Sequence, residues 1–344
     1  MTKLHIDGTD LYGSTVSDDL EVLWRWTAIG SAGAWNTYST GGPFGGGYIS
    51  KPSNSAESAY LSRAIASSSK VGFAGWWRPP SVGNGAALGQ FYIGGTAQIT
   101  LTGKTGGLID VKRGTEFGTI IATSTVAYSL NTWQHIEYLV KFHNTQGEVG
   151  IKINGNWVLA YTTGLDTINS ATGVDEFRLQ CQANGDDWAQ VVIYNDSTAG
   201  VPNNWIGPHK IPLLYVSADS TQLDFTASSG ASHFALLDDV PMDGNTYVYS
   251  TSTGTAEVLL VEDLVGSYAA YYGMNAVAIA RKDSIGGMQL RVGLESSSTY
   301  ALGTATNFST SYAGVEYWTT ATPGSTTGLT VGEINNVKWR AEVV

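Results

Sequence analysis

The chain has 344 residues, of which only 14% are charged, and its 29 acidic side chains against 18 lysines and arginines give a formal net charge of −11. This balance excludes a typical nucleic-acid partner, because phosphate binding needs clustered cations. No apolar run approaches the roughly 18 residues of a membrane-spanning helix, so no membrane span is expected. The first residues lack the apolar core of a secretory signal, and the single cysteine, Cys181, excludes an internal disulfide.

Short strands separated by turns succeed one another along the chain, and helical spacing is nearly absent. The strands expected in the longer N-terminal part are 71–78, 89–93, 97–101, 136–142, 148–153, 157–161, 177–181 and 188–194. Two hairpins are predicted, one across Gly94-Gly95 and one across the turn that ends at Gly147. Strands of this length with a turn about every 8–12 residues indicate an all-β protein of the sandwich or barrel type.

A change of composition over residues 196–222 marks the expected domain boundary. The stretch from Asp196 is small and polar, and Pro202, Pro208 and Pro212 punctuate the residues after it. A second set of short apolar strands then begins, at 247–249, 257–261, 276–280 and 289–294. We therefore predict an N-terminal extension over 1–19, a large β-sandwich over 20–215 and a smaller β-sandwich over 216–344.

Several motifs in the first sandwich are those of a known family. The run Trp133 to Tyr138, the turns at Gly147-Glu148 and Asn154-Gly155, and Asp186-Asp187 before a last strand together resemble the laminin-G/concanavalin-like jelly roll. The earlier strand Gly72 to Arg78 is similar to another strand of that family. The resemblance covers roughly residues 20–215 and implies an all-β fold, with an N-terminal jelly roll followed by a smaller C-terminal β-sandwich.

A second resemblance concerns the C-terminal part. The segment Phe234 to Gly244, with Asp238-Asp239 at its centre, and the segments 276–283 and 315–318 are similar to sequences that come after such jelly rolls in tailed-bacteriophage structural proteins. Residues 323–330 keep the shape of a further motif of that group but lack its tryptophan. The resemblance implies a virion protein, assembled in the host cytoplasm beside other virion proteins in a symmetric particle.

Aromatic side chains are in excess, with 11 tryptophans and 18 tyrosines. Such rings anchor subunit interfaces or stack on sugar rings. Trp76 and Trp77 are adjacent, so in a strand one of them must face away from the core. The residues we select as candidate glycan or partner contacts are Trp35, Tyr38, Trp76, Trp77, Tyr271 and Tyr272.

No catalytic residue is predicted. Glycoside hydrolysis requires two carboxyl groups on the same face, whereas the acidic pairs Asp175-Glu176 and Asp186-Asp187 are adjacent in sequence and would point to opposite faces of a strand. Asn184, Asp186 and Asp187 supply the oxygen ligands that Ca²⁺ prefers, but the same residues are typical of a solvated turn. We favour the turn, so no cofactor is expected, with Ca²⁺ as the alternative.

These observations favour a non-enzymatic structural protein of a tailed-phage particle, in the tail or as a head decoration. Such a protein would act through its subunit interfaces and through contact with a glycan of the host surface. A lectin-like carbohydrate-binding module, with or without Ca²⁺, is the first alternative. A glycan hydrolase is the second.

Overall fold

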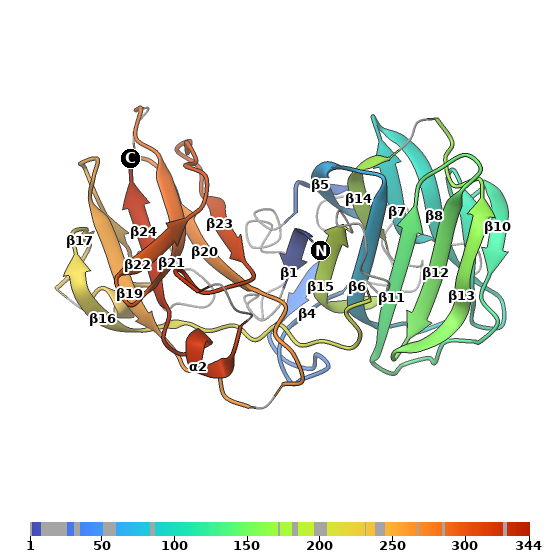
Figure 1. The fold of residues 1–344 in the computed structure, drawn as a ribbon, viewed down its shortest axis with the longest axis horizontal. Helices are drawn as coiled ribbons and strands as arrows, with labels where there is room; N and C mark the ends of the chain where they lie inside the picture. The colour runs from blue at the N-terminus through green and yellow to red at the C-terminus, as the bar shows by residue number, and fades with distance from the viewer. Residues whose placement is uncertain are drawn as a thin grey trace. The chain divides into compact units, whose positions relative to one another are not determined.

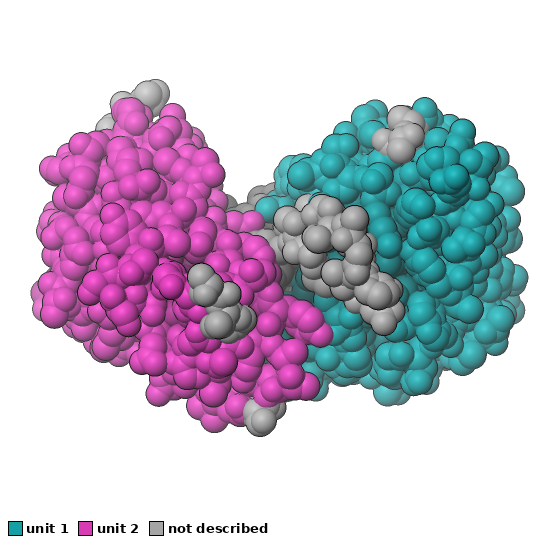
Figure 2. Space-filling model, in the orientation of Figure 1, with its two compact units in different colours: residues 1–211 teal, residues 212–344 magenta. Residues whose placement is uncertain are grey.

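The structure, a computed structural model, describes residues 2–7, 26–30, 35–50, 60–82, 87–170, 173–180, 185–195, 205–230, 232–237, 245–266, 268–283, 286–325 and 329–344. The chain divides into two compact units, Met1–Ile211 (unit 1) and Pro212–Val344 (unit 2) (Figures 1 and 2). In the described residues, no helix has the length and apolar character needed to cross a membrane.

Unit 1 consists of two antiparallel sheets, which we call sheet A and sheet B. Sheet A has the order β13-β12-β11-β6-β15-β4-β3, and β1 pairs with β15 as its eighth strand (Figure 1). Its strands are β1 (Thr2–Asp7), β3 (Asn36–Tyr38), β4 (Tyr48–Ser50), β6 (Lys70–Arg78), β11 (Gln134–Lys141), β12 (Gly147–Ile153), β13 (Asn156–Leu165) and β15 (Asp187–Asn195).

Sheet B has the order β10-β9-β8-β7-β14-β5-β2. Its strands are β2 (Ala28–Gly30), β5 (Tyr60–Ser68), β7 (Ala87–Ile93), β8 (Thr96–Lys104), β9 (Leu108–Arg113), β10 (Thr119–Thr123) and β14 (Val174–Gln180). The chain crosses from sheet B to sheet A and back through β5, β6 and β7. These crossings hold the two sheets face to face, which is the arrangement of a jelly roll.

The core of unit 1 lies between the two sheets and is dominated by aromatic rings. Phe73 stacks on Tyr138 with ring centroids 4.8 Å apart and on Phe177 at 4.9 Å, and all three side chains are fully buried. Gly89 leaves room for them, because a Cβ there would lie 2.3 Å from the Tyr138 hydroxyl. Each such ring buries a large apolar area, which is the main favourable contribution to folding.

Both predicted hairpins are present. Strands β7 and β8 pair across Gly94 and Gly95, which adopt φ values of 51° and 78° that favour glycine. Strands β11 and β12 pair from Ile136 opposite Ile153 to Lys141 opposite Glu148. The period-two pattern of the sequence therefore predicted the strands of both hairpins, and the structure shows their register.

Unit 2 is a smaller sandwich built around sheet C, whose order is β16-β19-β24-β21-β22. The elements of unit 2 are β16 (Val216–Leu223), β17 (Thr226–Ala227), η1 (Phe234–Leu236), β18 (Val248–Tyr249), β19 (Ala256–Val261), β20 (Met274–Ala280), β21 (Leu290–Ser296), β22 (Thr299–Leu302), β23 (Ala313–Thr319), α2 (Val331–Ile334) and β24 (Lys338–Val343). The β20-β23 pair packs on sheet C through Ala276, Val292 and Val315.

The predicted fold class is confirmed: the protein is all-β, with an N-terminal jelly roll followed by a smaller C-terminal β-sandwich. One detail differs from the expectation. Residues 1–19 were expected to be an extension, but β1 pairs with β15 and belongs to sheet A. No turn signal in the sequence marks this six-residue strand. Its pairing with β15 appears only in the structure.

Candidate functional site

Sheet A has a second face, turned away from the core, and the pleat decides which side chains reach it. On β6, Phe73 and Trp77 are fully buried in the core, so the alternate residues Ala74 and Trp76 belong to the opposite face. Strand pairing extends this alternation across the sheet, and Glu137 of β11 lies opposite Ala74. We call this side of the sheet the outer face.

Residues 205–211, which we call the strap, lie on the outer face and are held there by a buried carboxylate. Glu137 is fully buried and accepts hydrogen bonds from the backbone N–H groups of Ile206 (2.6 Å) and Gly207 (3.0 Å). It also accepts one from the Tyr194 hydroxyl at 2.8 Å. Burial raises the pKa of Glu137, and this effect outweighs the hydrogen bonds that act to lower it.

Two histidines attach the next part of the strap. Nε2 of His135 lies 3.1 Å from Nδ1 of His209, and Nε2 of His209 lies 2.7 Å from the carbonyl oxygen of Gln190. The Trp76 indole donates to the carbonyl of His209 at 2.7 Å. The strap is thus an integral part of unit 1, and it divides the outer face into two flanks.

One flank combines aromatic rings with cations, and we call it the lysine flank. Its members are Lys70, Lys141, Glu148, Lys152, Trp157, Tyr161 and Trp205. The register of the sheet brings them together, because Lys141 pairs with Lys70 on one side and with Glu148 on the other. Trp157 is 43% exposed although it is one of the largest apolar side chains.

The contacts within the lysine flank are close. The rings of Trp157 and Trp205 meet edge to face at 4.9 Å, and the Lys152 ammonium lies 4.5 and 4.9 Å from their centroids. Glu148 accepts hydrogen bonds from Lys141 at 3.2 Å and from the Tyr161 hydroxyl. Burial acts to raise the pKa of Glu148, but these two partners outweigh it and the pKa is lowered.

Gly150 forms the floor beneath these rings. A Cβ at this position would lie 2.7 Å from Cδ2 of Tyr161, 2.9 Å from Cζ3 of Trp157 and 3.1 Å from Cζ2 of Trp205. We expect Gly150→Ala to push the rings apart, which changes the near-UV circular dichroism and lowers the free energy of unfolding by about 1–2 kcal/mol. Gly332→Ala is the control, since a Cβ there meets nothing within 4 Å; an unchanged spectrum for Gly150→Ala would contradict the prediction.

The other flank is built around an arginine, and we call it the arginine flank. Its members are Tyr38, Phe44, Tyr48, Arg78, Trp133, Asp187 and Lys210. Tyr38 and Tyr48 stack with centroids 4.6 Å apart, and the Arg78 guanidinium lies 5.2 Å from the ring of Tyr48 and 5.0 Å from that of Trp133.

The charge of Arg78 is matched within the arginine flank. Its Nε donates to Oδ2 of Asp187 at 2.7 Å. Burial acts to lower the pKa of Arg78, but the Asp187 carboxylate outweighs it and the pKa is raised. Burial, followed by the charge of Asp187, raises the pKa of Tyr48, so its hydroxyl stays protonated near neutral pH. This flank presents aromatic surface with a paired charge.

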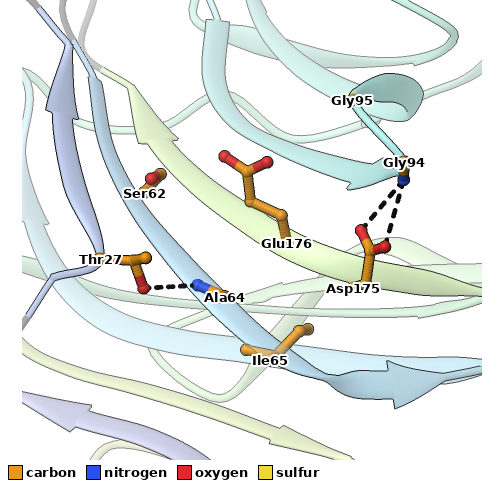
Figure 3. A pocket seen from close by; sticks show the side chains of 8 residues that line it. All are labelled: Thr27, Ser62, Ala64, Ile65, Gly94, Gly95, Asp175 and Glu176. Carbon is orange, nitrogen blue, oxygen red and sulfur yellow. Dashed lines mark hydrogen bonds between the residues drawn. The ribbon is translucent and has the colours of Figure 1, made fainter.

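A separate hollow of about 540 Å³ lies beside β14 of sheet B (Figure 3). Thr27, Gly94, Asp175 and Glu176 are among its lining residues. Asp175 accepts hydrogen bonds from the Gly94 N–H at 3.2 and 3.3 Å (Figure 3), and Glu176 pairs with Arg178 at 2.7 Å. Both carboxylates have partners within unit 1, and the described residues that line the hollow include no aromatic ring, so the outer face of sheet A is the stronger candidate.

The contact residues predicted in unit 1 separate by the side of the sheet on which they lie. Trp35 and Trp77 are 4% and 0% exposed and belong to the core, so their prediction as contact residues is wrong. Tyr38 is 38% exposed in the arginine flank, and Trp76 lies half-buried under the strap. The sequence required one of Trp76 and Trp77 to face outward, and only the structure shows which.

The two predicted contact residues of unit 2 have different surroundings. Tyr271 is half-buried and packs against the small apolar cluster of Leu264, Leu329 and Ile334. Tyr272 is 50% exposed. Contact of these two residues with a partner stays a prediction.

The hypothetical Ca²⁺ ligands are not gathered around one point in the described residues. Asn184 lies outside these residues, Asp186 is fully buried, and Asp187 pairs with Arg78. In the part of the chain that the structure describes, no group of three or more His, Cys, Asp or Glu side chains is placed to hold a metal ion. A Ca²⁺ site at these positions stays a prediction.

Sequence reasoning missed the lysine flank. Its three lysines lie on three different strands, β6, β11 and β12, and their spacing in the sequence does not indicate that they are neighbours: Lys70, Lys141 and Lys152. A usable signal was nevertheless present in the predicted hairpin, since its register places Lys141 opposite Glu148 and puts both on the polar face.

Comparison with known proteins yields structures but no sequence family. No protein-family model and no curated protein matches the chain. A mutant alginate lyase in complex with alginate trisaccharide is 12% identical, covers 57% of this chain and 99% of its own, and has a TM-score of 0.39. The endo-β-1,4-glucuronan lyase of Trichoderma reesei is 10% identical, with coverages of 57% and 94% and a TM-score of 0.37. Galectin LEC-6 of Caenorhabditis elegans is 10% identical, with coverages of 39% and 90% and a TM-score of 0.29. Likeness at this level concerns the fold alone.

The comparisons contradict the expected function. The named structures are two polysaccharide lyases and a galectin, and none of them is a virion protein. The prediction of a non-enzymatic structural protein of a phage particle is therefore wrong, and the expected virion partners have no support. One motif behind it, residues 315–318, lies within the ordinary strand β23; short strand sequences of this kind recur in unrelated sandwiches.

Proposed function

We propose that unit 1 is a carbohydrate-active domain that binds a polysaccharide on the outer face of sheet A. The observation that carries the proposal is the set of exposed rings on both flanks of the strap. Trp157, Phe44 and Tyr38 are 43%, 44% and 38% exposed, respectively. Sugar rings have apolar C–H faces, and exposed aromatic side chains beside a few polar groups are the surface that such faces contact.

The flanks also supply groups that can orient a sugar. The Asp187 carboxylate with Arg78 on one flank, and Glu148 with Lys141 on the other, are charged hydrogen-bonding partners beside the rings. Hydroxyl groups of a sugar both donate and accept, so acid–base pairs of this kind suit them. The middle of the strap, residues 206–209, lies between the two groups of residues, so each flank provides its own contacts.

The proposal predicts that truncation of one ring on each flank weakens binding. We expect Trp157→Ala and Tyr38→Ala each to weaken the affinity for a bound polysaccharide about tenfold, because loss of one well-placed aromatic contact costs about 1–2 kcal/mol. Isothermal titration calorimetry of the full chain against neutral and anionic polysaccharides measures this. Phe117→Ala is the control, since Phe117 is 90% exposed and lies outside both flanks. Absence of binding by the unmodified chain across the panel would overturn the proposal.

Cleavage of the bound glycan is the second candidate function, favoured by one observation. Glu148 is an ionised carboxylate in hydrogen-bond contact with the Tyr161 hydroxyl and with Lys141, next to the exposed ring of Trp157. A carboxylate and a phenol in contact are a pair able to move a proton. Release of reducing ends that Glu148→Gln abolishes, with binding retained, would support cleavage; binding without release of reducing ends would exclude it for the glycans tried.

A further inference from the structure

The lysine flank contrasts with the charge of the whole molecule. The chain carries 18 lysines and arginines against 29 acidic residues, yet Lys70, Lys141 and Lys152 lie on neighbouring strands β6, β11 and β12 of the outer face. Glu148 is the one acidic member of this flank, and it pairs with Lys141. Three ammonium groups against one carboxylate leave this surface positive on an otherwise acidic protein.

Among the described residues, buried Glu137 is the next carboxylate on this face, and it does not cancel the excess. It lies opposite Lys152 in the sheet, but its oxygens accept from Ile206, Gly207 and Tyr194 beneath the strap. Even when Glu137 is counted as fully ionised, three positive charges face two negative ones. The flank therefore retains a net positive charge with either protonation state of Glu137.

The position of the Lys152 ammonium shows how a ligand would be held. It lies over the two tryptophan rings of the flank, 4.5 Å from the centroid of Trp157 and 4.9 Å from that of Trp205. A sugar that contacts the exposed part of the Trp157 ring not covered by Lys152 would bring a charged substituent close to this ammonium. The combination of a stacking face and adjacent cations suits a sugar that carries an anionic group.

The arginine flank provides an internal comparison. Its Arg78 is paired with Asp187 at 2.7 Å, and its further cation, Lys210, is exposed and lies 5.7 Å from the ring of Phe44. Two cations and one carboxylate give it an excess of one positive charge. The lysine flank has an excess of two when Glu148 is its one carboxylate, and of one when Glu137 is counted as ionised. Both flanks have exposed aromatic rings, but the lysine flank has three cations and the arginine flank two.

We propose that the lysine flank selects an anionic polysaccharide, with Lys70, Lys141 and Lys152 receiving its carboxylate or sulfate groups. This inference rests on the proposed glycan-binding function and names the substrate class of that site. Carboxylate and sulfate groups are both anionic oxygen acceptors, and ammonium groups bind both. A carboxylated polysaccharide and a sulfated one are therefore both needed as probes to show which group is recognised.

The test is a titration of the full chain with polygalacturonate, dextran sulfate and a neutral dextran at low and high NaCl. We expect tighter binding of at least one anionic polymer than of dextran, and a loss at high salt, because exposed charge pairs are screened. The triple variant Lys70→Gln/Lys141→Gln/Lys152→Gln should weaken anionic binding about tenfold or more, and by more than it weakens the binding of dextran. Lys104→Gln is the matched control, since Lys104 lies on β8 of sheet B, outside both flanks.

The outcomes separate this inference from the function on which it rests. Equal binding of dextran and the anionic polymers, or a triple variant that binds them as well as the unmodified chain does, overturns the anionic assignment and leaves glycan binding intact. Absence of binding to every polysaccharide overturns both. A preference for polygalacturonate identifies the carboxylate as the recognised group, and a preference for dextran sulfate identifies the sulfate. The thermal unfolding midpoint of each variant shows that the fold is retained.

Discussion

Replacing Glu137 with alanine is expected to lower the free energy of unfolding of unit 1 by about 3 kcal/mol or more. The carboxylate accepts hydrogen bonds from the Ile206 and Gly207 N–H groups and from the Tyr194 hydroxyl, and it is fully buried. Its removal leaves these donors without an acceptor, and each unsatisfied buried donor costs about 1–3 kcal/mol. Urea unfolding followed by near-UV circular dichroism measures the loss.

The same substitution should release the strap. Hydrogen exchange at the amides of Ile206 and Gly207 should become much faster, because these two groups donate directly to the lost carboxylate. Glu137→Gln retains one oxygen acceptor, so its exchange rates should lie between those of the unmodified chain and those of Glu137→Ala. Glu148→Ala is the control, because it removes a half-buried carboxylate that does not accept from the strap. Unchanged protection of both amides in Glu137→Ala would show that the carboxylate does not hold the strap.

Acidification from pH 7 to pH 5 is expected to destabilise unit 1 through its buried histidine pair. Nε2 of His135 lies 3.1 Å from Nδ1 of His209, which is also 3.2 Å from the Gly207 carbonyl oxygen, and Nε2 of His209 lies 2.7 Å from the carbonyl of Gln190. Burial lowers the pKa of both rings, which favours the neutral form of each. Nδ1 of His135 is buried without a hydrogen-bond partner. A proton added there would have no acceptor, so the folded state resists protonation.

The direction of the effect is set by the pKa. Burial, together with the nearby His209, lowers the pKa of His135 to about 2, and burial also lowers that of His209. The unfolded chain binds these protons near pH 6.5, so stability is present above that pH and is lost as the pH falls below it. For His135 alone the loss at pH 5 is about 2 kcal/mol. Glu137, whose pKa is raised, acts in the opposite sense.

His135→Phe isolates the contribution of the histidine. The difference between the free energies of unfolding at pH 7 and pH 5 should shrink by about 2 kcal/mol in this variant, because the phenyl ring binds no proton in either state. Urea titrations at the two pH values, followed by near-UV circular dichroism, give both numbers. An unchanged pH dependence would mean that groups other than His135 cause the acid sensitivity.

Both predictions concern the strap, and the strap bears directly on the proposed function. Its anchoring residues Glu137, His135 and Gln190 have side-chain or backbone contacts with it at the middle of the outer face. A ligand therefore meets the two flanks, which include Trp205 and Lys210 of the strap, and not the middle of the strap at residues 206–209. If the predicted effects are measured, the strap is a fixed element, and variants on the flanks can be interpreted without assuming that it moves.

Much of the fold could be predicted because it depends on local patterns. Alternation along residues 136–142 and 148–153, with a turn between them, defines a hairpin and its register whatever surrounds it. The same pattern fixes which side chains share a face, so Glu137 and Lys141 could be assigned to one side of β11. The adjacent pair Trp76 and Trp77 could likewise be separated onto opposite faces, although not assigned.

The candidate site was missed because it depends on contacts between distant parts of the chain. The strap reaches the outer face through hydrogen bonds such as that between Glu137 and Ile206, which are 69 residues apart. The periodicity of the sequence does not show that a loop covers one side of a sheet. It also does not show that Lys70 lies next to Lys141. Alternation along a strand is a property of neighbouring residues and can be read from their order. The order of strands in a sheet, and the segment that covers it, result from the packing of the whole unit and appear only when the chain has folded.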